Sequence, residues 1–324
     1  MKKVWNNKLI KNKYGQVRSG WLILAVMAAY NLIVYALSYL LIETLRKILT
    51  STGDINAATG ELSQFAGWID STALPILLQI ITEAVLILVP IIMWRNIMKR
   101  PTRELGLTTA GTPKKDCRAG MLLGIISCTI VFLITITVGG GHVVSWVPRI
   151  TGPAIIWILI FILVAFGEEI LTRGFIMSTL RRTRNIYIIL LVPSVIFGLI
   201  HLSNPNVTLL SVTNIIIFGI LFSYMYIKSG NIWMCIGYHF TWNTFQGIIY
   251  GMPVSGLNVP GFITTEFTQN NLLNGGGFGI EGGILTTIVS ILGIIFIKYY
   301  YRNSEYDFIN NNQKPKENRK EPNS

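Results

Sequence analysis

Residues 167–175 read Gly-Glu-Glu-Ile-Leu-Thr-Arg-Gly-Phe, and they lie inside an apolar run that begins at Pro153. An ionised carboxylate in such a run is costly unless it is paired, faces a water-filled cavity or takes part in chemistry. On a helix, Glu169 and Arg173 stand four residues apart on one face and can neutralise each other, whereas Glu168 points roughly 100° away. Taken alone, the stretch is equally typical of a buried ion pair that fixes helix packing. Glu168 is the carboxylate that such a pair leaves unexplained.

The composition places this stretch in a membrane protein. Of the 324 residues, 51% are hydrophobic and 13% are charged, and the apolar runs reach the length of about 20 residues that a membrane span needs. We therefore expect an all-α, polytopic integral membrane protein in a lipid bilayer, and we exclude a soluble globule. Cys117, Cys128 and Cys235 form no close pair, so neither a disulfide framework nor a thiolate metal site is indicated.

Eight transmembrane helices are expected, and the basic residues between them predict their orientation. The expected spans are 21–45, 73–94, 119–138, 153–180, 186–203, 207–227, 231–250 and 283–301. With the N-terminus inside the cell, 23 Lys and Arg residues lie on inner segments and 3 on outer segments. This partition predicts a multi-pass protein of the cell membrane with cytoplasmic N- and C-termini. The same pattern accounts for the net charge of +12, so no nucleic-acid partner is expected.

The chain divides into five parts by composition. Residues 1–20 form a basic cytoplasmic arm, and 21–150 hold the N-terminal transmembrane helices and loops. Residues 151–250 carry the polar motifs, 251–302 contain an external loop and the last span, and 303–324 are expected to be a disordered cytoplasmic tail. The external segment 251–282, rich in Gly, Asn and Thr, is most simply interpreted as a connector. The sequence does not indicate an oligomeric state.

Two histidines lie in the apolar C-terminal half, each with a companion one helical turn away. Phe197 precedes His201 by four residues, and Asn243 follows His239 by four, so each pair shares a helix face. A single histidine in a membrane helix more often makes an interhelical hydrogen bond than binds a ligand. This chain differs from that situation, because it places two carboxylates, two imidazoles and one carboxamide on three spans. Together they could polarise a water, accept its proton and stabilise an oxyanion.

These motifs resemble those of one family. The pattern Glu-Glu-x-x-x-Arg at residues 168–173, Phe-x-x-x-His at 197–201 and His-x-x-x-Asn at 239–243 is similar to that of the CPBP family. This family contains CAAX-type prenyl endopeptidases and bacteriocin-processing or self-immunity proteins, and its domain is also called Abi. The resemblance covers about residues 150–250. It implies an intramembrane, glutamate-dependent endopeptidase that acts on peptide or membrane-associated protein substrates.

The resemblance also implies roles for individual residues. Glu168 would activate the hydrolytic water, His201 and His239 would bind a metal or position that water, and Asn243 would stabilise the tetrahedral oxyanion. Glu169 and Arg173 would hold the helix, with Phe197 as a supporting residue. Glu168 and the two imidazoles meet the ligand count of a catalytic Zn²⁺ or another divalent metal. Because no His-Glu-x-x-His helix is present, a metal-free glutamate-activated water is an open alternative.

Three other functions are compatible with parts of the sequence. A bacteriocin self-immunity protein could keep the same motifs and act by binding rather than cleavage. His201 and His239 could be the axial ligands of a haem, although this leaves Glu168 and Glu169 unexplained. A transporter could use Glu168 as a proton relay, but no internal repeat supports one.

One feature of the sequence does not fit the simplest arrangement. At about 1.5 Å per residue, His239 lies roughly 12 Å and His201 roughly 24 Å from the inner ends of their spans, so the two histidines are not at the same depth.

Glu83 and Gln79 in the second span are interpreted as interhelical hydrogen-bonding groups. Of these lesser polar residues, Glu83 is the one most worth comparing with a structure.

Overall fold

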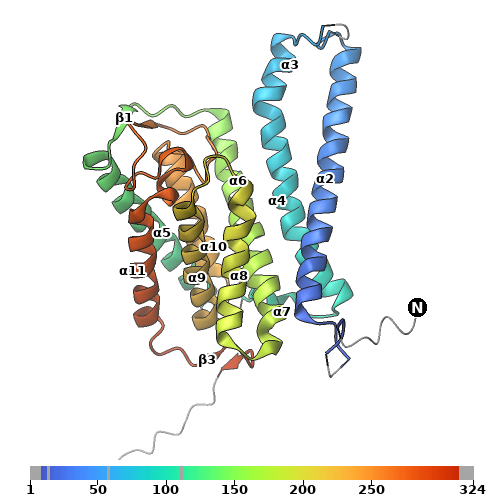
Figure 1. Ribbon diagram of the computed structural model, residues 1–324, viewed down its shortest axis with the longest axis vertical. Coiled ribbons are helices and arrows are strands. Elements are labelled where there is room, and N and C mark those ends of the chain that lie inside the picture. The colour runs from blue at the N-terminus through green and yellow to red at the C-terminus, as the bar shows by residue number, and fades with distance from the viewer. Residues whose placement is uncertain (1–8, 13–14, 57–58, 110–111, 314–324) are drawn as a thin grey trace, which may run out of the picture.

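The computed structural model describes residues 9–12, 15–56, 59–109 and 112–313, and shows a bundle of long helices (Figure 1). Within these residues, six helical segments are long and apolar enough to cross a membrane. They are Ser19–Ser51, Gln64–Ile97, Pro113–Thr137, Gly152–Thr183, Ile186–Ser203 and Leu209–Ser229. The protein is therefore a polytopic helical membrane protein, as the composition predicts.

Each long segment contains a named helix, and some continue into wider or tighter turns. The helices are α2 (Ser19–Ser51), α3 (Gln64–Trp68), α4 (Leu74–Ile92), α5 (Pro113–Thr137), α6 (Gly152–Glu169), α7 (Ser178–Leu180), α8 (Ile186–Ile200), α9 (Leu209–Ser229), α10 (Trp233–Asn243) and α11 (Ile284–Tyr300). The π-helical turns are Ile69–Ala73, Met93–Ile97, Ile170–Met177 and Thr244–Ile249. The 3₁₀ turns are Thr102–Leu105, Arg181–Thr183, His201–Ser203, Gly276–Phe278 and Ile280–Gly282.

The count of eight full-length spans is not confirmed. The expected seventh span is α10 continued by the π turn Thr244–Ile249, and α10 itself has 11 residues. The expected eighth span, α11, has 17 residues. Both are shorter than the run of about 20 residues that crosses a hydrocarbon core. The other six predicted spans lie within the observed helical segments to within a few residues.

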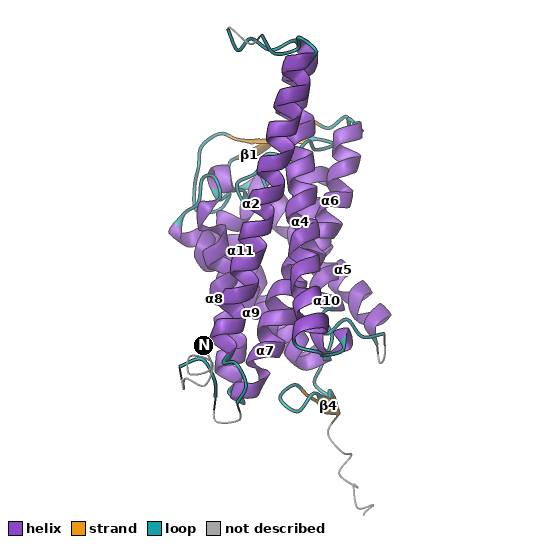
Figure 2. Ribbon diagram, turned by 90° about the vertical axis from the view of Figure 1, so that its right-hand side faces the viewer, coloured by secondary structure: helices purple, strands orange, loops and turns teal. Residues whose placement is uncertain are grey.

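The helices separate into a hairpin and a main bundle (Figures 1 and 2). The hairpin consists of α2 and α4, joined through α3, and α2 contacts α4 and α7. The main bundle contains α5, α6, α8, α9, α10 and α11, and α4 packs against α6 to join the two parts. At about 1.5 Å per residue, the 33 residues of α2 exceed the thickness of a bilayer core, and α2 extends beyond the main bundle (Figure 2).

Local sequence signals begin the helices that carry the polar motifs. Pro153 occupies the first turn of α6, where its missing N–H costs nothing, and the Thr151 hydroxyl accepts from the N–H of Ala154. The Asn185 side chain caps α8 by accepting from two backbone N–H groups. Thr208 and Ser211 form a reciprocal capping box at the start of α9. These caps fix where each helix enters the bundle.

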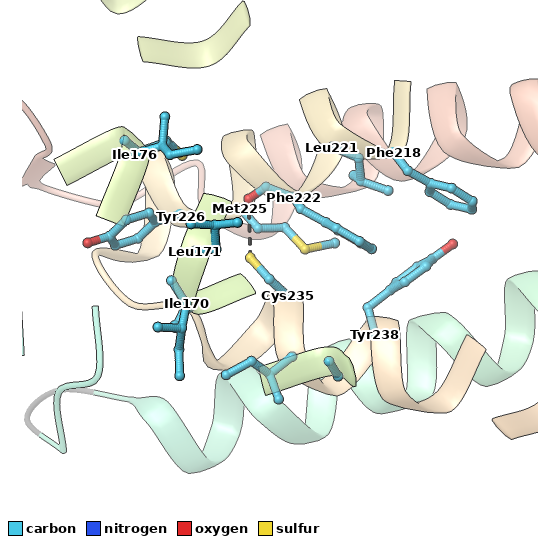
Figure 3. Close-up of a cluster of buried hydrophobic side chains, with 14 of the residues drawn as sticks. Ile170, Leu171, Ile176, Phe218, Leu221, Phe222, Met225, Tyr226, Cys235 and Tyr238 are labelled. Carbon is cyan, nitrogen blue, oxygen red and sulfur yellow. Dashed lines mark hydrogen bonds between the residues drawn. The ribbon is translucent and has the colours of Figure 1, made fainter. Parts of the chain in front are cut away.

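The core of the main bundle is formed mainly by aromatic and branched side chains (Figure 3). Phe218 and Phe222 on α9 contact Tyr238 on α10, and the Cys235 thiol donates to the carbonyl of Phe222 at 3.2 Å. The contact between α5 and α10 depends on glycine. A Cβ on Gly237 would lie 2.4 Å from the carbonyl oxygen of Cys117, so a larger residue would push the helices apart.

The segment 251–282, called the outer segment here after its predicted location, and the tail differ from their predicted forms. Strand β2 (Thr264–Phe267) of the outer segment pairs antiparallel with strand β1 (Gly141–Ser145), which lies between α5 and α6. The outer segment is therefore more than a connector, because it packs against a loop that is distant in sequence. Residues 303–313 are not a disordered tail, because β3 (Tyr306–Asp307) and β4 (Asn312–Gln313) form a hairpin and Phe308 is buried against Tyr226. An aromatic side chain that finds a pocket offsets the entropy of ordering its segment. Residues 1–8 of the basic arm and 314–324 of the tail lie outside the described residues.

Candidate active site

The Glu-Glu-x-x-x-Arg motif lies at a change of helix type. α6 ends at Glu169, and the chain continues through the π turn Ile170–Met177. π turns are rare in proteins, and those that occur are often found at functional sites. The extra residue in the turn changes the direction of the side chains. Here the change of pitch directly follows the two carboxylates. Glu168 and Glu169 therefore lie at the end of the regular α-helical part of this span.

Glu169 and Arg173 form the predicted ion pair. Their atoms Oε1 and Nη1 are 3.1 Å apart, and both side chains are completely buried. The guanidinium also donates to Thr172 Oγ1 at 2.7 Å and to the carbonyl of Gly219 at 3.2 Å. Its carbon Cζ lies 4.5 Å from the ring centre of Phe197 and 5.2 Å from that of Phe222. Arg173 is thus held between two aromatic rings and a carboxylate, which joins α6, α8 and α9.

Glu169 has a second partner that the helix geometry did not predict. The Nδ1 atom of His239 lies 3.1 Å from Oε1 of Glu169. Since a carboxylate accepts hydrogen bonds, His239 carries its proton on Nδ1 and its Nε2 is left as the free nitrogen. His201 has the same arrangement, because its Nδ1 lies 2.7 Å from the carbonyl of Phe197 and must donate to it. Each imidazole is oriented through Nδ1.

Both free Nε2 atoms face Glu168. The Nε2 of His239 lies 3.8 Å from Oε2 of Glu168, and the Nε2 of His201 lies 4.0 Å from Oε1. These separations are too long for direct hydrogen bonds but short enough for one water to bridge each pair. Oε2 of Glu168 is buried and has no hydrogen-bond partner among the described protein atoms. Glu168, the carboxylate that is not part of the predicted ion pair, therefore faces two imidazoles.

A cavity of about 420 Å³ joins these groups to the α2–α4 hairpin. Glu168, His201, His239 and Asn243 all line it. The other lining residues come from α2, α4, α6 with its π turn, the end of α8 and the outer segment: Met27, Tyr30, Asn31, Gln79, Thr82, Glu83, Leu86, Trp157, Phe161, Val164, Leu171, Ile200, Ser203, Asn204, Val254, Ser255, Leu257 and Val259. The structure thus brings all four candidate catalytic residues to one space.

The outer segment supplies one pair that sequence reasoning missed. Glu281 is buried, and its Oε2 accepts from the backbone N–H and from the hydroxyl of Ser255, the latter at 2.8 Å. Ser255 has a φ of +47°, in the left-handed region that a serine adopts only when its surroundings hold it there. Ser255 and Glu281 also border a small space together with His201, His239 and Asn243. Glu281 is one of two carboxylates, with Glu266, in a Gly-rich segment that has no Lys or Arg, and this is the signal that could have indicated the pair.

Glu83 lies in the same cavity as Glu168. Its Oε1 accepts from Nε2 of Gln79 at 2.8 Å, and its Oε2 is buried with no partner among the described protein atoms. The close approach of α4 to α6 requires Gly167, since a Cβ there would lie 2.8 Å from Oε2 of Glu83. The interpretation of Glu83 and Gln79 as groups that bridge two helices is wrong for the described residues, because both lie on α4, their bond is within one helix, and the second oxygen of Glu83 has no partner.

The depth difference between His201 and His239 has a structural explanation. α10 follows a turn that is buried inside the bundle, since Asn231 and Ile232 are 2% and 0% exposed. Asn231 Nδ2 donates to Oδ2 of the buried Asp116 at 2.7 Å. Furthermore, His201 folds back along α8, because its Nδ1 bonds to the carbonyl one turn earlier. Counting residues from the ends of the spans cannot show either effect.

The chemistry of the donor set is compatible with a divalent metal. Two imidazole Nε2 atoms and a carboxylate are ordinary ligands for Zn²⁺, and hydrogen bonds from the opposite nitrogens to a carboxylate and a carbonyl are the usual support for such ligands. The spacing is wider than in a preformed site. Among the described residues, no group of three or more His, Cys, Asp or Glu side chains is close enough to hold an ion.

Residues 150–245 match the family model described as "Type II CAAX prenyl endopeptidase Rce1-like". We call these residues the Rce1-like segment, after the family model that they match. The resemblance to CAAX-type endopeptidases of the CPBP family is therefore confirmed over the helices that carry Glu168, His201 and His239. Outside the Rce1-like segment, α2, α4 and the outer segment complete the cavity wall.

A curated relative agrees with this assignment over a similar length. The Bacillus subtilis (strain 168) protein named "Putative membrane peptidase YdiL" is 31% identical over 111 residues. The match covers 34% of this chain and 41% of that protein, so the chain matches less than half of its relative's length. No solved structure matches the chain.

Proposed function

We propose that the protein is a membrane endopeptidase of the CAAX-protease type in which Glu168 activates the hydrolytic water. The observation that carries this proposal is the position of the Glu168 carboxylate, 3.8 and 4.0 Å from the Nε2 atoms of His239 and His201. Since both Nδ1 atoms are used elsewhere, each Nε2 presents a lone pair to the cavity. A water between these groups would be oriented by the imidazoles and deprotonated by the carboxylate.

The residues can perform the hydrolysis in two proton transfers. Glu168 accepts a proton from water while the water oxygen attacks the carbonyl carbon of the peptide bond. The carbonyl oxygen becomes an oxyanion, and the Asn243 carboxamide, which lines the same cavity, donates a hydrogen bond to it. Glu168 then returns the proton to the amide nitrogen as the C–N bond breaks. The products are one carboxylic acid and one amine.

A divalent metal ion such as Zn²⁺ would be held by Glu168 and the two Nε2 atoms. When bound, it would polarise the attacking water as a Lewis acid. Glu169 would then act through His239, because a carboxylate on Nδ1 makes the imidazole a better ligand. The metal-dependent and metal-free forms of the proposal differ in one measurement, namely the effect of a chelator on cleavage.

The proposed substrate is a peptide or protein segment in or beside the membrane. The cavity lies between helices that cross the bilayer, and its wall combines apolar side chains such as Phe161 and Leu257 with polar ones such as Asn31 and Asn204. Such a lining can hold an extended peptide by its backbone while its apolar side chains remain out of water. We propose no prenyl group as a requirement, because no observation on the site selects one.

The test compares the peptides of membranes that contain the wild-type protein with those that contain Glu168→Ala. We expect a set of cleaved peptides that is present with the wild type and absent with the variant, at equal amounts of folded protein. Purified wild-type protein with a synthetic version of one such peptide then measures cleavage directly, with and without a chelator. Identical peptide sets from the two membranes would contradict the proposal and would instead favour a binding role.

A further inference from the structure

A second cavity, of about 390 Å³, lies at the end of the bundle that carries both described termini. It shares no lining residue with the candidate active site. Four arginines line it, namely Arg100, Arg181, Arg182 and Arg184, and Glu104 is the one acidic residue among its described lining residues. The lining therefore carries a clear excess of positive charge.

The cavity lies at the level where membrane spans end. Arg100 follows the segment Gln64–Ile97, Arg181 and Arg182 lie in the last turn of the fourth segment, which ends at Thr183, and Arg184 lies between the fourth and fifth segments. Gln16, which also lines the cavity, lies three residues before the start of α2 at Ser19. Side chains at the ends of several spans meet the headgroups of the lipids. The excess charge is therefore placed where phosphate groups of a bilayer lie.

The guanidinium groups of Arg181 and Arg184 are held in place with donors left over. Arg181 lies over the ring of Phe308 at 4.3 Å and donates from Nη2 to the hydroxyl of Tyr226 at 3.3 Å. Its Nε is buried with no hydrogen-bond partner among the described protein atoms. Arg184 donates to Oδ1 of Asn310 at 3.0 Å. A guanidinium has five N–H donors, so these bonds leave others for a ligand.

The remaining two arginines are fixed in the same way. Arg182 donates from Nη1 to the carbonyl of Val17 at 2.7 Å and from Nε to that of Thr179 at 3.1 Å. Arg100 pairs with Glu104 at 3.1 Å, with its guanidinium carbon 5.6 Å from the ring centre of Trp94. Membrane orientation requires basic residues on one side but needs neither a shared cavity nor fixed side chains. The arrangement calls for a more specific explanation than orientation.

We propose that this cavity binds a phosphate group, supplied by the headgroup of an anionic membrane lipid. Guanidinium groups match phosphate oxygens in geometry and charge, and several held in place around one cavity lose little freedom on binding. Inorganic phosphate offers the same chemistry from solution. The lipid is the source that the location of the cavity favours, because span ends and headgroups lie at one level.

The test measures the melting temperature of the full chain, purified in a neutral detergent and a phosphate-free buffer. Three probes are added separately: short-chain phosphatidylglycerol, short-chain phosphatidylcholine and inorganic phosphate. The variant Arg100→Gln with Arg184→Gln removes the two most exposed arginines of the cavity. The matched control, Lys114→Gln with Arg118→Gln, removes the same charge from exposed residues that do not line it.

We expect phosphatidylglycerol to raise the melting temperature of the wild type and of the control by about 2–4 °C at saturation. In the cavity variant, the half-saturating concentration should rise by about tenfold or more. A matching response to inorganic phosphate would support the phosphate site and identify solution as a source. Equal responses to phosphatidylglycerol and phosphatidylcholine, equal responses of the two variants, or no response at all would overturn the proposal. If the cavity variant does not fold, Arg184→Gln alone takes its place.

Discussion

The Rce1-like helices and the wall around them are built differently. In the segment Gly152–Thr183, 56% of the most apolar stretch of 18 residues is buried inside the protein, whereas only 11% of the corresponding stretch of α2 is buried. Within the Rce1-like helices, Glu169 holds Arg173 and His239 at 3.1 Å each. In the wall, Glu83 lines the cavity and has one buried oxygen without a hydrogen-bond partner among the described protein atoms. The comparison indicates a rigid centre around Arg173 that holds the proposed reacting groups, and a wall in which α2 is loosely packed and is the part able to adjust to a substrate.

The largest expected effect comes from removing the charge of Glu168. Glu168→Gln should lower peptide cleavage by about 10²–10⁴-fold, because an amide cannot accept a proton from water. The variant should fold at least as well as the wild type, since it no longer places an ionised group in an apolar interior. Cleavage assays and melting temperatures check both. Glu266→Gln, on the exposed strand β2, is the matched control and should change neither. Substantial cleavage by Glu168→Gln would break the assignment of this centre.

Glu169 should behave in the opposite way, although it is the adjacent and identical residue. Glu169→Gln leaves the completely buried Arg173 without its counter-ion and should destabilise the fold by about 3–5 kcal/mol. The yield of folded protein in detergent and its melting temperature measure this loss. Adding Arg173→Met should restore part of the stability, because it removes the uncompensated charge. A well-folded, inactive Glu169→Gln beside an active Glu168→Gln would mean that the two roles are reversed.

A smaller effect is expected in the wall, at the contact that holds Ser255. Glu281→Gln weakens two charge-assisted hydrogen bonds to this loop residue, and we expect KM to rise by about tenfold with kcat changed less. Ser255→Gly, which accepts the positive φ without strain, should keep part of the loop geometry and lose only the hydroxyl contact. An equal loss of kcat would place Glu281 in the rigid centre instead.

The same residue gives a pH dependence with a definite sign. Burial raises the pKa of Glu281 above its ordinary value of 4.5, while the hydrogen bonds from Ser255 and the nearby imidazoles of His201 and His239 act in the other direction. Because the pKa is raised in the folded state, this contribution to stability is present below about pH 4.5 and is lost as the pH rises through the folded-state pKa. The melting temperature of the wild type relative to Glu281→Gln should therefore fall with rising pH. A constant difference would contradict a burial-driven shift.

The smallest effect concerns which side of the membrane each region faces. A cysteine at residue 310, beside the arginine cavity, should not react with an impermeant thiol reagent added outside cells, whereas one at residue 269 should react. Both positions are exposed, so the membrane alone should make the difference. The background variant Cys117→Ser removes the one native cysteine that is not buried. Neither cysteine substitution should alter cleavage. Labelling at 310 from outside would invert the predicted orientation.

The sequence by itself determined the membrane class, the approximate positions of the helices and the family that the motif-bearing segment resembles. These follow from local properties, since hydrophobic length, caps and the spacing of residues along one helix are visible in the chain. The pairing of Glu169 with Arg173 is of this kind, because four residues on one helix bring two side chains together. The same reasoning correctly separated Glu168 from that pair.

Only the tertiary structure decided which residues from different helices meet. The contact of His239 with Glu169, the buried turn that starts α10, and the anchoring of Ser255 by Glu281 all join segments distant in sequence. No periodicity of one helix encodes such a contact, because it depends on where separate helices enter the bundle and how closely they pack. The wall of the cavity is decided in the same way, since α2, α4 and the outer segment carry no motif and acquire their role from the side chains they bring next to Glu168.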